Sequence, residues 1–513
     1  MRTTNSIKNV IIALLGNIIA LVLGFVNQKY FISILGIDYT GLNGVLTNLI
    51  SMLSIVELGL GTAIIYHLYE PIANNDIESI KSLLLFYKKS YRIIALIITI
   101  IGISILPFIG FIIDVSLINE NVYLIYFLFL ADTVFSYFIA YKRSIIYANQ
   151  QNRIVDFVHI IYTLLLNFFQ ISLLIITHDY TLFLFIKIVF RLLENLVISK
   201  IADKMYPFIK DKNVNSLTSN IKNEIKKMVY GQLYHQIGGS LVMGTDNIIM
   251  SSFLGLAVTG IYSNYNIITN AANTVLSQMF NALTGSVGNL LVENDKDHSY
   301  EVYCKINFIN FILFSFSSVG LFFCINDFIS IWLNTKELLF HNMWVLLFSL
   351  NYYMQGMRRT LQTFAGAGGI CYENRYVPIM EAVINLVASL ILVKILGIYG
   401  VIIGTILSKL VLYFYGFPKY IYSPLFGKKY SEFILEIFKQ FVILILMYLV
   451  NYIVLYKLLS LINVYSIFYL ILKVILIIFL NIIIIISFYH NNKSFLYFKN
   501  IFQEKILNIY QNK

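Results

Sequence analysis

Apolar runs of about 20 residues recur along the whole chain, and each run is long enough to cross a lipid bilayer as an α-helix. The chain is 59% hydrophobic and 12% charged, whereas a soluble globular protein carries about 25% charged residues. The sequence lacks the short segments of strict apolar–polar alternation that a transmembrane β-barrel requires. It therefore predicts an all-α polytopic membrane protein.

Fourteen segments are predicted to span the membrane: 10–34, 41–66, 91–113, 120–142, 154–177, 180–201, 229–254, 259–291, 303–333, 338–362, 376–395, 397–420, 432–455 and 463–489. The first apolar run is too long for a signal peptide, so we expect it to be the first span. These spans predict five parts: an N-terminal six-helix lobe over 1–202, a basic cytoplasmic linker over 203–228, a second six-helix lobe over 229–425, two further helices over 426–490, and a cytoplasmic amphipathic tail over 491–513.

The distribution of lysine and arginine orients these spans. One set of connecting segments contains Lys81, Arg92, Arg143 and the lysine-rich linker, whereas the opposite loops, such as "GIDYTG" and "NTKELLFHN", are short and nearly free of cations. The positive-inside rule then places both termini in the cytoplasm. The net charge of +11 lies beside anionic lipid headgroups in this topology, so nucleic-acid binding is a poor interpretation.

A weak internal repeat divides the spans into two sets. "LGIDYTG" at 35–41 matches "LGLAVTG" at 254–260, at an offset of 219 residues, from 35 to 254. The same offset aligns Thr47, Ser51 and Ser54 with Asn266, Asn270 and Asn273. Because each repeat holds an even number of spans, we expect two parallel lobes related by an axis along the membrane normal. Chance similarity between short apolar strings is the alternative.

Charged residues inside predicted spans mark candidate functional positions, because a charge at mid-bilayer costs about 2.5–3.5 kcal/mol on insertion scales. In "LFIKIVFRLLENLV", Lys187 and Arg191 lie one helical turn apart and repel unless an anion lies beside them. An internal pair of Arg191 with Glu194 is one structural explanation. The other charges within spans are Lys29, Glu57, Asp132, Asp246, Glu381 and Lys409. Lys29 lies near a span end and has an equally good explanation in snorkelling to the interface.

Two polar stripes run along predicted spans. One holds Gln232, His235, Gly239 and Asp246, and the other holds Asn266, Asn270, Asn273, Ser277 and Asn281. Amides and hydroxyls on one helix face suit the hydroxyls of a sugar, and they equally suit hydrogen bonds between helices. Histidine, cysteine and acidic residues lack the spacing of a metal site, and the three cysteines, at 304, 324 and 371, are too widely separated to indicate a disulfide framework.

Three stretches resemble the polysaccharide repeat-unit flippases of O-antigen and capsule assembly, the Wzx-type branch of the multidrug/oligosaccharidyl-lipid/polysaccharide (MOP) exporter superfamily. They are "KYFISILGIDYTGLNGVLTNLISMLSIVELGLGTAIIYHLYEPIANND", "GTDNIIMSSFLGLAVTGIYSNY" and "RYVPIMEAVINLVASLILVKILGIYGVIIGTILS". The resemblance covers essentially the whole chain. It implies two six-helix lobes around a central cavity, alternating access, and an undecaprenyl-pyrophosphate-linked oligosaccharide as the substrate.

The resemblance also assigns roles to residues of this chain. It implies that the cavity cations are Lys29, Lys187, Arg191 and Lys409. The polar stripe adds Asn266, Asn270 and Asn273 as further substrate-binding candidates. The candidates for ion coupling are Glu57, Asp132, Asp246 and Glu381. The resemblance further implies a transporter of the bacterial cytoplasmic membrane that is not an enzyme, needs no cofactor, draws on a proton or sodium gradient, and has membrane lipids and the polysaccharide polymerase machinery as partners.

Three alternatives remain at this stage. A cation-coupled multidrug exporter of the same superfamily should have an acidic cavity and usually lacks the last two spans. A lipid II flippase of the same superfamily is another alternative. A membrane glycosyltransferase or polymerase would need catalytic groups, commonly on a long outer loop, and the outer loops here are short and carry no acid/base pair.

Overall fold

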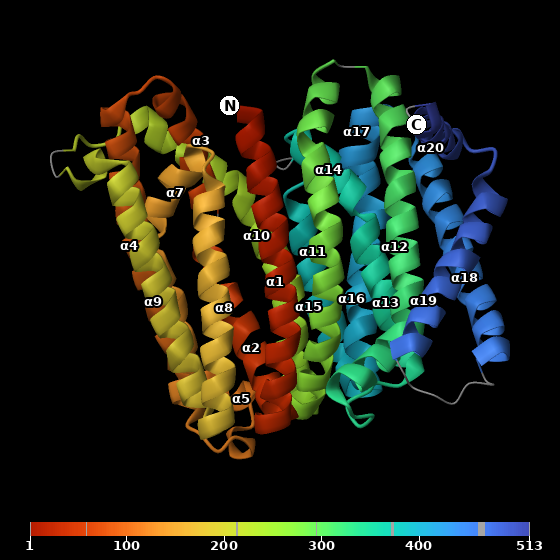
Figure 1. The fold of residues 1–513 in the computed structure, drawn as a ribbon, viewed down its shortest axis with the longest axis horizontal. Helices are drawn as coiled ribbons and strands as arrows, with labels where there is room; N and C mark the ends of the chain where they lie inside the picture. The colour runs from red at the N-terminus through yellow and green to blue at the C-terminus, as the bar shows by residue number, and fades with distance from the viewer. Residues whose placement is uncertain are drawn as a thin grey trace. The chain divides into compact units, whose positions relative to one another are not determined.

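The computed structural model describes residues 2–57, 59–211, 214–293, 295–370, 374–459 and 467–511, and its regular elements there are all helical (Figure 1). The α-helices are α1 Arg2–Leu35, α2 Ile37–Leu53, α3 Leu60–Ala73, α4 Ile77–Ile105, α5 Ile109–Ile112, α6 Val122–Tyr137, α7 Ala140–Ala148, α8 Asn152–Thr177, α9 Tyr180–Met205, α10 Ser219–Leu254, α11 Leu256–Val292, α12 Lys296–Leu333, α13 Asn342–Met357, α14 Arg359–Ala367, α15 Tyr376–Leu396, α16 Ile398–Val411, α17 Ser423–Phe426, α18 Tyr430–Leu459, α19 Ile467–Tyr489 and α20 Lys493–Gln511. The all-α prediction is confirmed.

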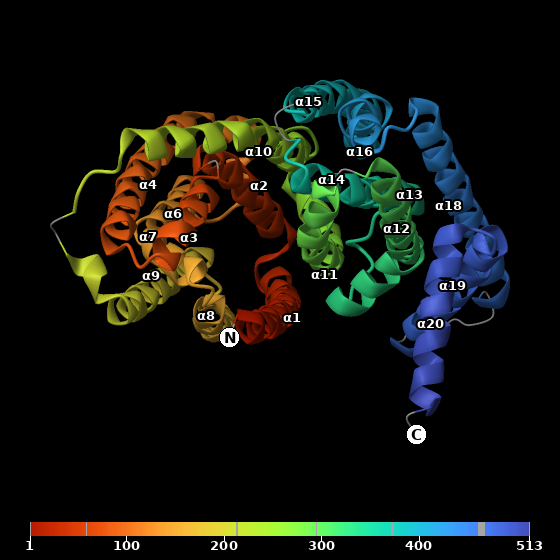
Figure 2. The same cartoon turned by 90° about the horizontal axis from the view of Figure 1, so that it is seen from above.

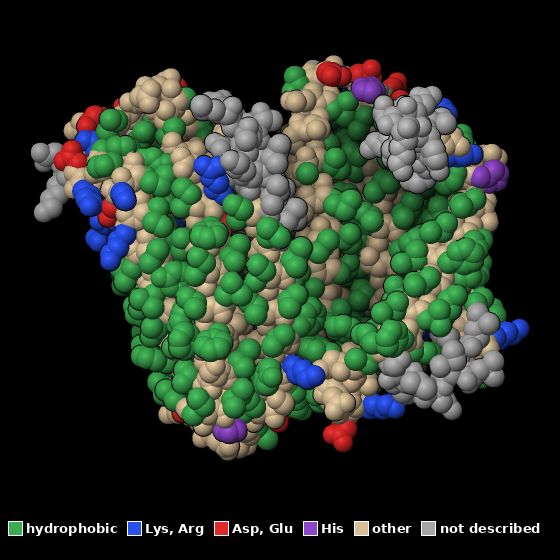
Figure 3. Space-filling view, viewed as in Figure 1, with side chains coloured by type: hydrophobic (Ala, Val, Ile, Leu, Met, Phe, Trp, Pro, Cys, Tyr) green, Lys and Arg blue, Asp and Glu red, His purple; other side chains and the backbone are tan. Residues whose placement is uncertain are grey.

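Eight helical stretches in the described residues are long and apolar enough to cross a membrane, and the α6–α7 pair, bent by 45°, makes a ninth. Hydrophobic side chains cover the middle of the helices, and most charged side chains lie toward their ends (Figure 3). The described residues of the five remaining expected spans, 41–66, 180–201, 229–254, 259–291 and 338–362, are largely helical too. They do not meet the length and hydropathy requirement for a membrane span, because they are broken into shorter helices or carry several charged and polar side chains.

Helix boundaries repeat at the offset found in the sequence. The nine-residue helix α14 begins at Arg359 and ends at Ala367, each 219 residues after the ends of α7, from 140 to 359. Gly36 precedes α2 with φ 95° and ψ 178°, and Gly255 precedes α11 with φ 89° and ψ 170°. This left-handed conformation favours glycine at both breaks. Matching breaks at matching positions support the repeat over chance similarity.

The repeated glycines also permit a close helix crossing. A Cβ atom on Gly41 would lie 2.1 Å from the carbonyl oxygen of Leu256, and one on Gly260 would lie 2.2 Å from the carbonyl oxygen of Ile37. Each pair maps onto the other under the 219-residue offset. The backbones of α2 and α11 therefore touch in a locally twofold manner that any larger side chain would prevent.

Packing divides the chain into two compact units, Met1–Ser263 and Asn264–Lys513. The dividing point falls inside α11, because α10 packs on α2 and α3 and is thereby grouped with the first unit. The lobe boundaries expected from the sequence therefore differ from these packing units and stay a prediction. In Figure 2 α1 lies beside α8.

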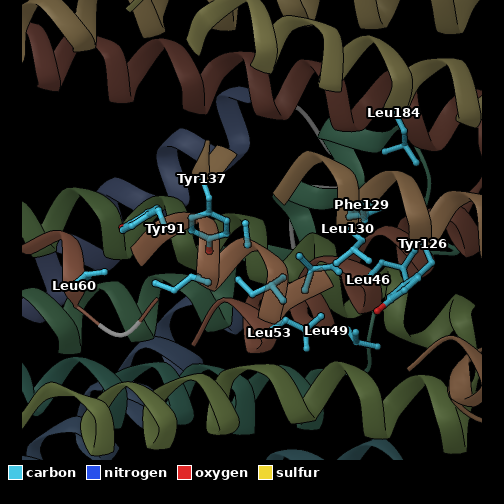
Figure 4. Packing of buried hydrophobic residues seen from close by; sticks show 14 of the residues in the cluster. Leu46, Leu49, Leu53, Leu60, Tyr91, Tyr126, Phe129, Leu130, Tyr137 and Leu184 are labelled. Atoms are coloured by element: carbon cyan, nitrogen blue, oxygen red, sulfur yellow. The ribbon is translucent and has the colours of Figure 1, made fainter. Parts of the chain in front are cut away.

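Each unit has its own buried core. The core of the first unit joins aliphatic side chains of α2 to aromatic ones of α4 and α6, including Leu46, Tyr91, Tyr126 and Tyr137 (Figure 4). The core of the second unit is richer in aromatic rings from α12, α14 and the π-helical stretch Pro418–Tyr422 that precedes α17. These cores position the charged helix faces described below.

The linker between α9 and α10 is anchored at its start. After α9 a short 3₁₀ turn, Pro207–Lys210, leads to Asp211, whose carboxylate lies 3.0 Å from the Lys81 ammonium of α4. The Ser82 hydroxyl donates to the carbonyl oxygen of Asn215 at 2.8 Å. Asp76 caps the start of α4 nearby and accepts hydrogen bonds from the Ser79 side chain and backbone. These bonds lower the pKa of the Asp76 carboxyl.

Candidate functional site

Two cations on α9 share one carboxylate of α6. The Lys187 ammonium lies 3.3 Å from Asp132 Oδ2, and Arg191 Nε donates to Asp132 Oδ1 at 3.2 Å. The Asp132 side chain is 10% exposed, whereas each cation is 34% exposed. The Lys187 ammonium also stands 5.3 Å from the centroid of the Phe129 ring. Asp132 therefore offsets the repulsion between Lys187 and Arg191 that the sequence predicts.

The structure corrects the explanation that paired Arg191 with Glu194. Glu194 Oε1 instead lies 2.9 Å from Arg143 Nη2 and 3.1 Å from His159 Nδ1. The choice of partner for Glu194 depends on the tertiary fold, because Arg143 and His159 come from α7 and α8. Sequence reasoning used Arg143 only for topology and missed His159, since neither is close to Glu194 along the chain.

Within the described residues, the guanidinium of Arg191 forms one protein hydrogen bond, through Nε. Its two terminal amino groups remain for another partner. A small pocket of about 70 Å³ lies beside them between α8 and α9, and its walls include His159, Tyr162, Arg191 and Lys187. Planar guanidinium donors suit the oxygens of a phosphate.

The charges around this pocket do not cancel. The charged residues that line it are Lys187, Arg191 and Glu194, so its walls carry one net positive charge when His159 is neutral. A surplus positive charge within an apolar helix bundle is costly unless it meets an anion or water. The cluster therefore has the charge expected of a site for an anionic group.

The other two predicted cations lie elsewhere. Lys29 is exposed on α1, and no hydrogen bond or ion pair of its side chain is found in the described part of the chain. Lys409, on α16 of the second unit, is 3% exposed, and its ammonium donates to the backbone oxygen of Asn351 at 3.2 Å and to the Asn351 side chain. Neither lysine is brought into the contacts around Asp132.

The asparagines of the α11 stripe differ in their exposure. Asn270 is exposed, and Asn266 and Asn273 are partly buried. In the part of the chain described here, none of the three amides bonds to another helix, and Asn273 Oδ1 is buried without a partner. The side chains of Gln232 and His235, on the other stripe, lie outside the described residues.

The four candidate coupling carboxylates differ in their partners. Asp132 holds the two α9 cations, and Glu381 forms a 2.9 Å ion pair with Arg358. Asp246 is 7% exposed on α10 and has an interaction partner. Glu57 accepts a hydrogen bond from Tyr91.

Glu57 lies where the predicted second span is interrupted between α2 and α3, in the 3₁₀ turn Ser54–Glu57. Among the described residues Glu57 forms no ion pair. The described chain also holds no group of three or more histidine, cysteine or acidic side chains arranged to bind a metal ion.

Comparisons with known proteins identify the fold. No protein-family model and no curated protein matches the sequence. The solved structure of the lipid II flippase MurJ, in an inward closed conformation, matches with a TM-score of 0.63 at 14% identity and covers 94% of this chain and 99% of MurJ. At this identity the likeness establishes the fold alone.

Two MATE transporter structures share that fold over less of the chain. An inward-facing multidrug resistance MATE family transporter of the MOP superfamily matches with a TM-score of 0.54 at 15% identity, over 78% of this chain and 94% of its own. A mutant form of the Vibrio cholerae MATE transporter VcmN matches with a TM-score of 0.57 at 14% identity, over 80% of this chain and 94% of its own. The chain therefore has the fold of these transporters and of MurJ.

Proposed function

We propose that this protein flips undecaprenyl-pyrophosphate-linked oligosaccharide repeat units from the cytoplasmic to the outer leaflet of the bacterial membrane. Cell-surface polysaccharide assembly would use the flipped units. The observation that carries this proposal is the sharing of Asp132 by Lys187 and Arg191, each one-third exposed, beside a pocket with a surplus positive charge. No covalent chemistry is required of the protein.

The arrangement suits a pyrophosphate that must pass through hydrocarbon. An anionic headgroup loses its hydration in the bilayer, and charge-assisted hydrogen bonds to the protein offset that loss. The free terminal amino groups of Arg191 can bind two phosphate oxygens, and Lys187 supplies a point charge one turn away. Asp132 holds both cations in place while no substrate is bound, and the pyrophosphate competes with it.

Other parts of the substrate also find suitable surfaces. The amides of Asn266 and Asn270 on α11, without hydrogen bonds to other helices in the described part, suit sugar hydroxyls. In the second unit an apolar pocket of about 330 Å³ lies against α18, and its walls include Tyr353, Phe414 and Phe438. Such a pocket suits a lipid chain better than a polar drug.

A lipid II flippase is the second candidate, because its substrate is also lipid-linked and the MurJ fold covers 94% of this chain. The surplus positive charge serves both candidates equally. A MATE-type drug exporter is less favoured, since the MATE structures cover only 78–80% of the chain and the cluster on α9 is net cationic rather than acidic.

For energy coupling we propose Glu57 among the four carboxylates. Asp132 and Glu381 are held by cations in the structure, whereas the described partner of Glu57 is the Tyr91 hydroxyl. A carboxylate without a cation partner in an apolar setting can bind and release a proton with less loss of structure than an ion-paired one.

The deciding experiment is complementation. The chain is expressed in one strain that lacks its polysaccharide repeat-unit flippase and in another depleted of its lipid II flippase, with membrane abundance measured in both. We expect polymer export to recover in the first strain and viability to stay low in the second. Recovery of viability alone would assign the chain to lipid II instead.

A further inference from the structure

A second polar pocket lies in the C-terminal part of the chain. It has a volume of about 350 Å³ and lies between the first turns of α12 and α18 and the segment that joins α19 to α20. Its walls include Tyr300, Glu432, Glu436, Lys439, Gln440 and Ser494. The lysine and arginine distribution assigns this end of the helices to the cytoplasm, so the pocket lies at the depth of inner-leaflet headgroups.

The two carboxylates that line this pocket form no ion pair in the described part of the chain. Glu436 accepts a hydrogen bond from Asn307 Nδ2 at 2.7 Å, and no ion pair of Glu432, Glu436 or Lys439 is found in the described residues. Glu432, Glu436 and Lys439 follow one another at i, i+4 and i+7 and therefore share one face of α18. The Lys439 ammonium stands 5.1 Å from the centroid of the Tyr489 ring instead of bonding to either carboxylate.

A buried amide independently points to a ligand. Gln440 is 4% exposed and lines both this pocket and the apolar pocket beside α18. In the described residues its amide forms no hydrogen bond. An amide that faces a cavity without a protein partner is available to hydrogen-bond a ligand there.

We propose that this pocket binds the headgroup of an amine-bearing zwitterionic phospholipid from the inner leaflet. The primary ammonium would donate hydrogen bonds to Glu436 and Glu432, and the phosphate would meet Lys439 and Gln440. A purely anionic headgroup fits poorly, because two carboxylates and one lysine leave the pocket net negative.

The surface outside the pocket accommodates the lipid chains. Leu435, which lines the pocket, is 67% exposed, and Phe438 is 65% exposed one turn further along α18. Ile486 of α19 is 47% exposed. These exposed apolar side chains lie on the two helices that line the pocket, and they suit contact with acyl chains that continue from the headgroup into the bilayer. The site is separate from the α9 cluster and goes beyond the proposed transport function.

The test compares two lipids that differ only in the amine. Purified full-length protein is mixed with equal amounts of phosphatidylethanolamine and phosphatidylcholine that carry the same acyl chains, and bound lipids are counted by native mass spectrometry. Phosphatidylcholine keeps the charge and loses the N–H donors. We expect the wild-type protein to prefer phosphatidylethanolamine by about tenfold, the value of one charge-assisted hydrogen bond.

Three variants separate the pocket from general charge effects. Glu436→Gln should abolish the preference, and Gln440→Ala should reduce it, which keeps the test usable if the first variant folds poorly. Glu301→Gln is the matched control, since Glu301 lies at the same end of α12 and pairs with Lys305 rather than lining the pocket. Equal binding of both lipids by the wild type, or an unchanged preference in both pocket variants, would overturn the proposal.

Discussion

Substitutions of Arg191 and Lys187 test the proposed substrate site most directly, because the structure predicts different effects on ligand binding and on folding. In Arg191→Ala the Asp132 carboxylate keeps Lys187 at 3.3 Å. Arg191 is 34% exposed, so loss of its pair with Asp132 should cost no more than about 1 kcal/mol, as for exposed ion pairs. Membrane abundance should therefore stay near that of the wild type.

Export should respond differently. Loss of the guanidinium removes charge-assisted hydrogen bonds worth about 1.5–3 kcal/mol to the pyrophosphate, which corresponds to a reduction in affinity of about tenfold to a hundredfold. Arg191→Lys should retain partial export because it keeps the charge and loses the fork of donors. Arg191→Glu should abolish export through repulsion.

Removal of both cations tests the structural contribution of the cluster. Asp132 is 10% exposed and has no other ion pair in the described residues, so Lys187→Ala/Arg191→Ala leaves a buried carboxylate uncompensated. Such a change costs about 3–5 kcal/mol, and abundance should fall sharply. Addition of Asp132→Asn should restore abundance, because a neutral amide needs no counterion, and should leave export lost.

The assay is polymer export per molecule of membrane protein in these variants. Normal export per molecule in Arg191→Ala would remove this residue from the substrate site. Recovery of export in the triple variant would show that the cations serve the fold alone.

The remaining predictions concern coupling, packing and topology. Glu57→Gln should make export insensitive to an imposed pH gradient while the protein stays folded, because Tyr91 can donate to an amide oxygen as well; an unaltered pH dependence would return coupling to the other carboxylates. Gly260→Ala should lower thermal stability, since its Cβ would lie 2.2 Å from a backbone oxygen, whereas Gly285→Ala, with open space around it on the same helix, should not. Single cysteines in the 214–218 segment should react with membrane-impermeant reagents only in opened cells, and cysteines in "NTKELLF" should react in intact cells.

Much of the fold could be predicted from the sequence. Apolar length determined that the chain forms membrane-spanning helices, because a backbone in hydrocarbon must satisfy its own hydrogen bonds. The repeat at 219 residues anticipated matching helix breaks, since Gly36 and Gly255 share a conformation that other residues rarely adopt. The pattern could not show that α10 would pack with the first unit, because apolar faces in lipid are not specific for one partner.

The candidate site, too, could be predicted only in part from the sequence. The sequence by itself determined that Lys187 and Arg191 share one face of a helix and need an anion, because helical periodicity and Coulomb repulsion act within a single element. Only the tertiary structure decided that Asp132 supplies this anion and that Glu194 belongs to Arg143 and His159. The first pairing joins α6 to α9, and the second joins both α7 and α8 to α9. Both depend on how helices distant in the sequence pack together, and local chemistry does not specify that packing.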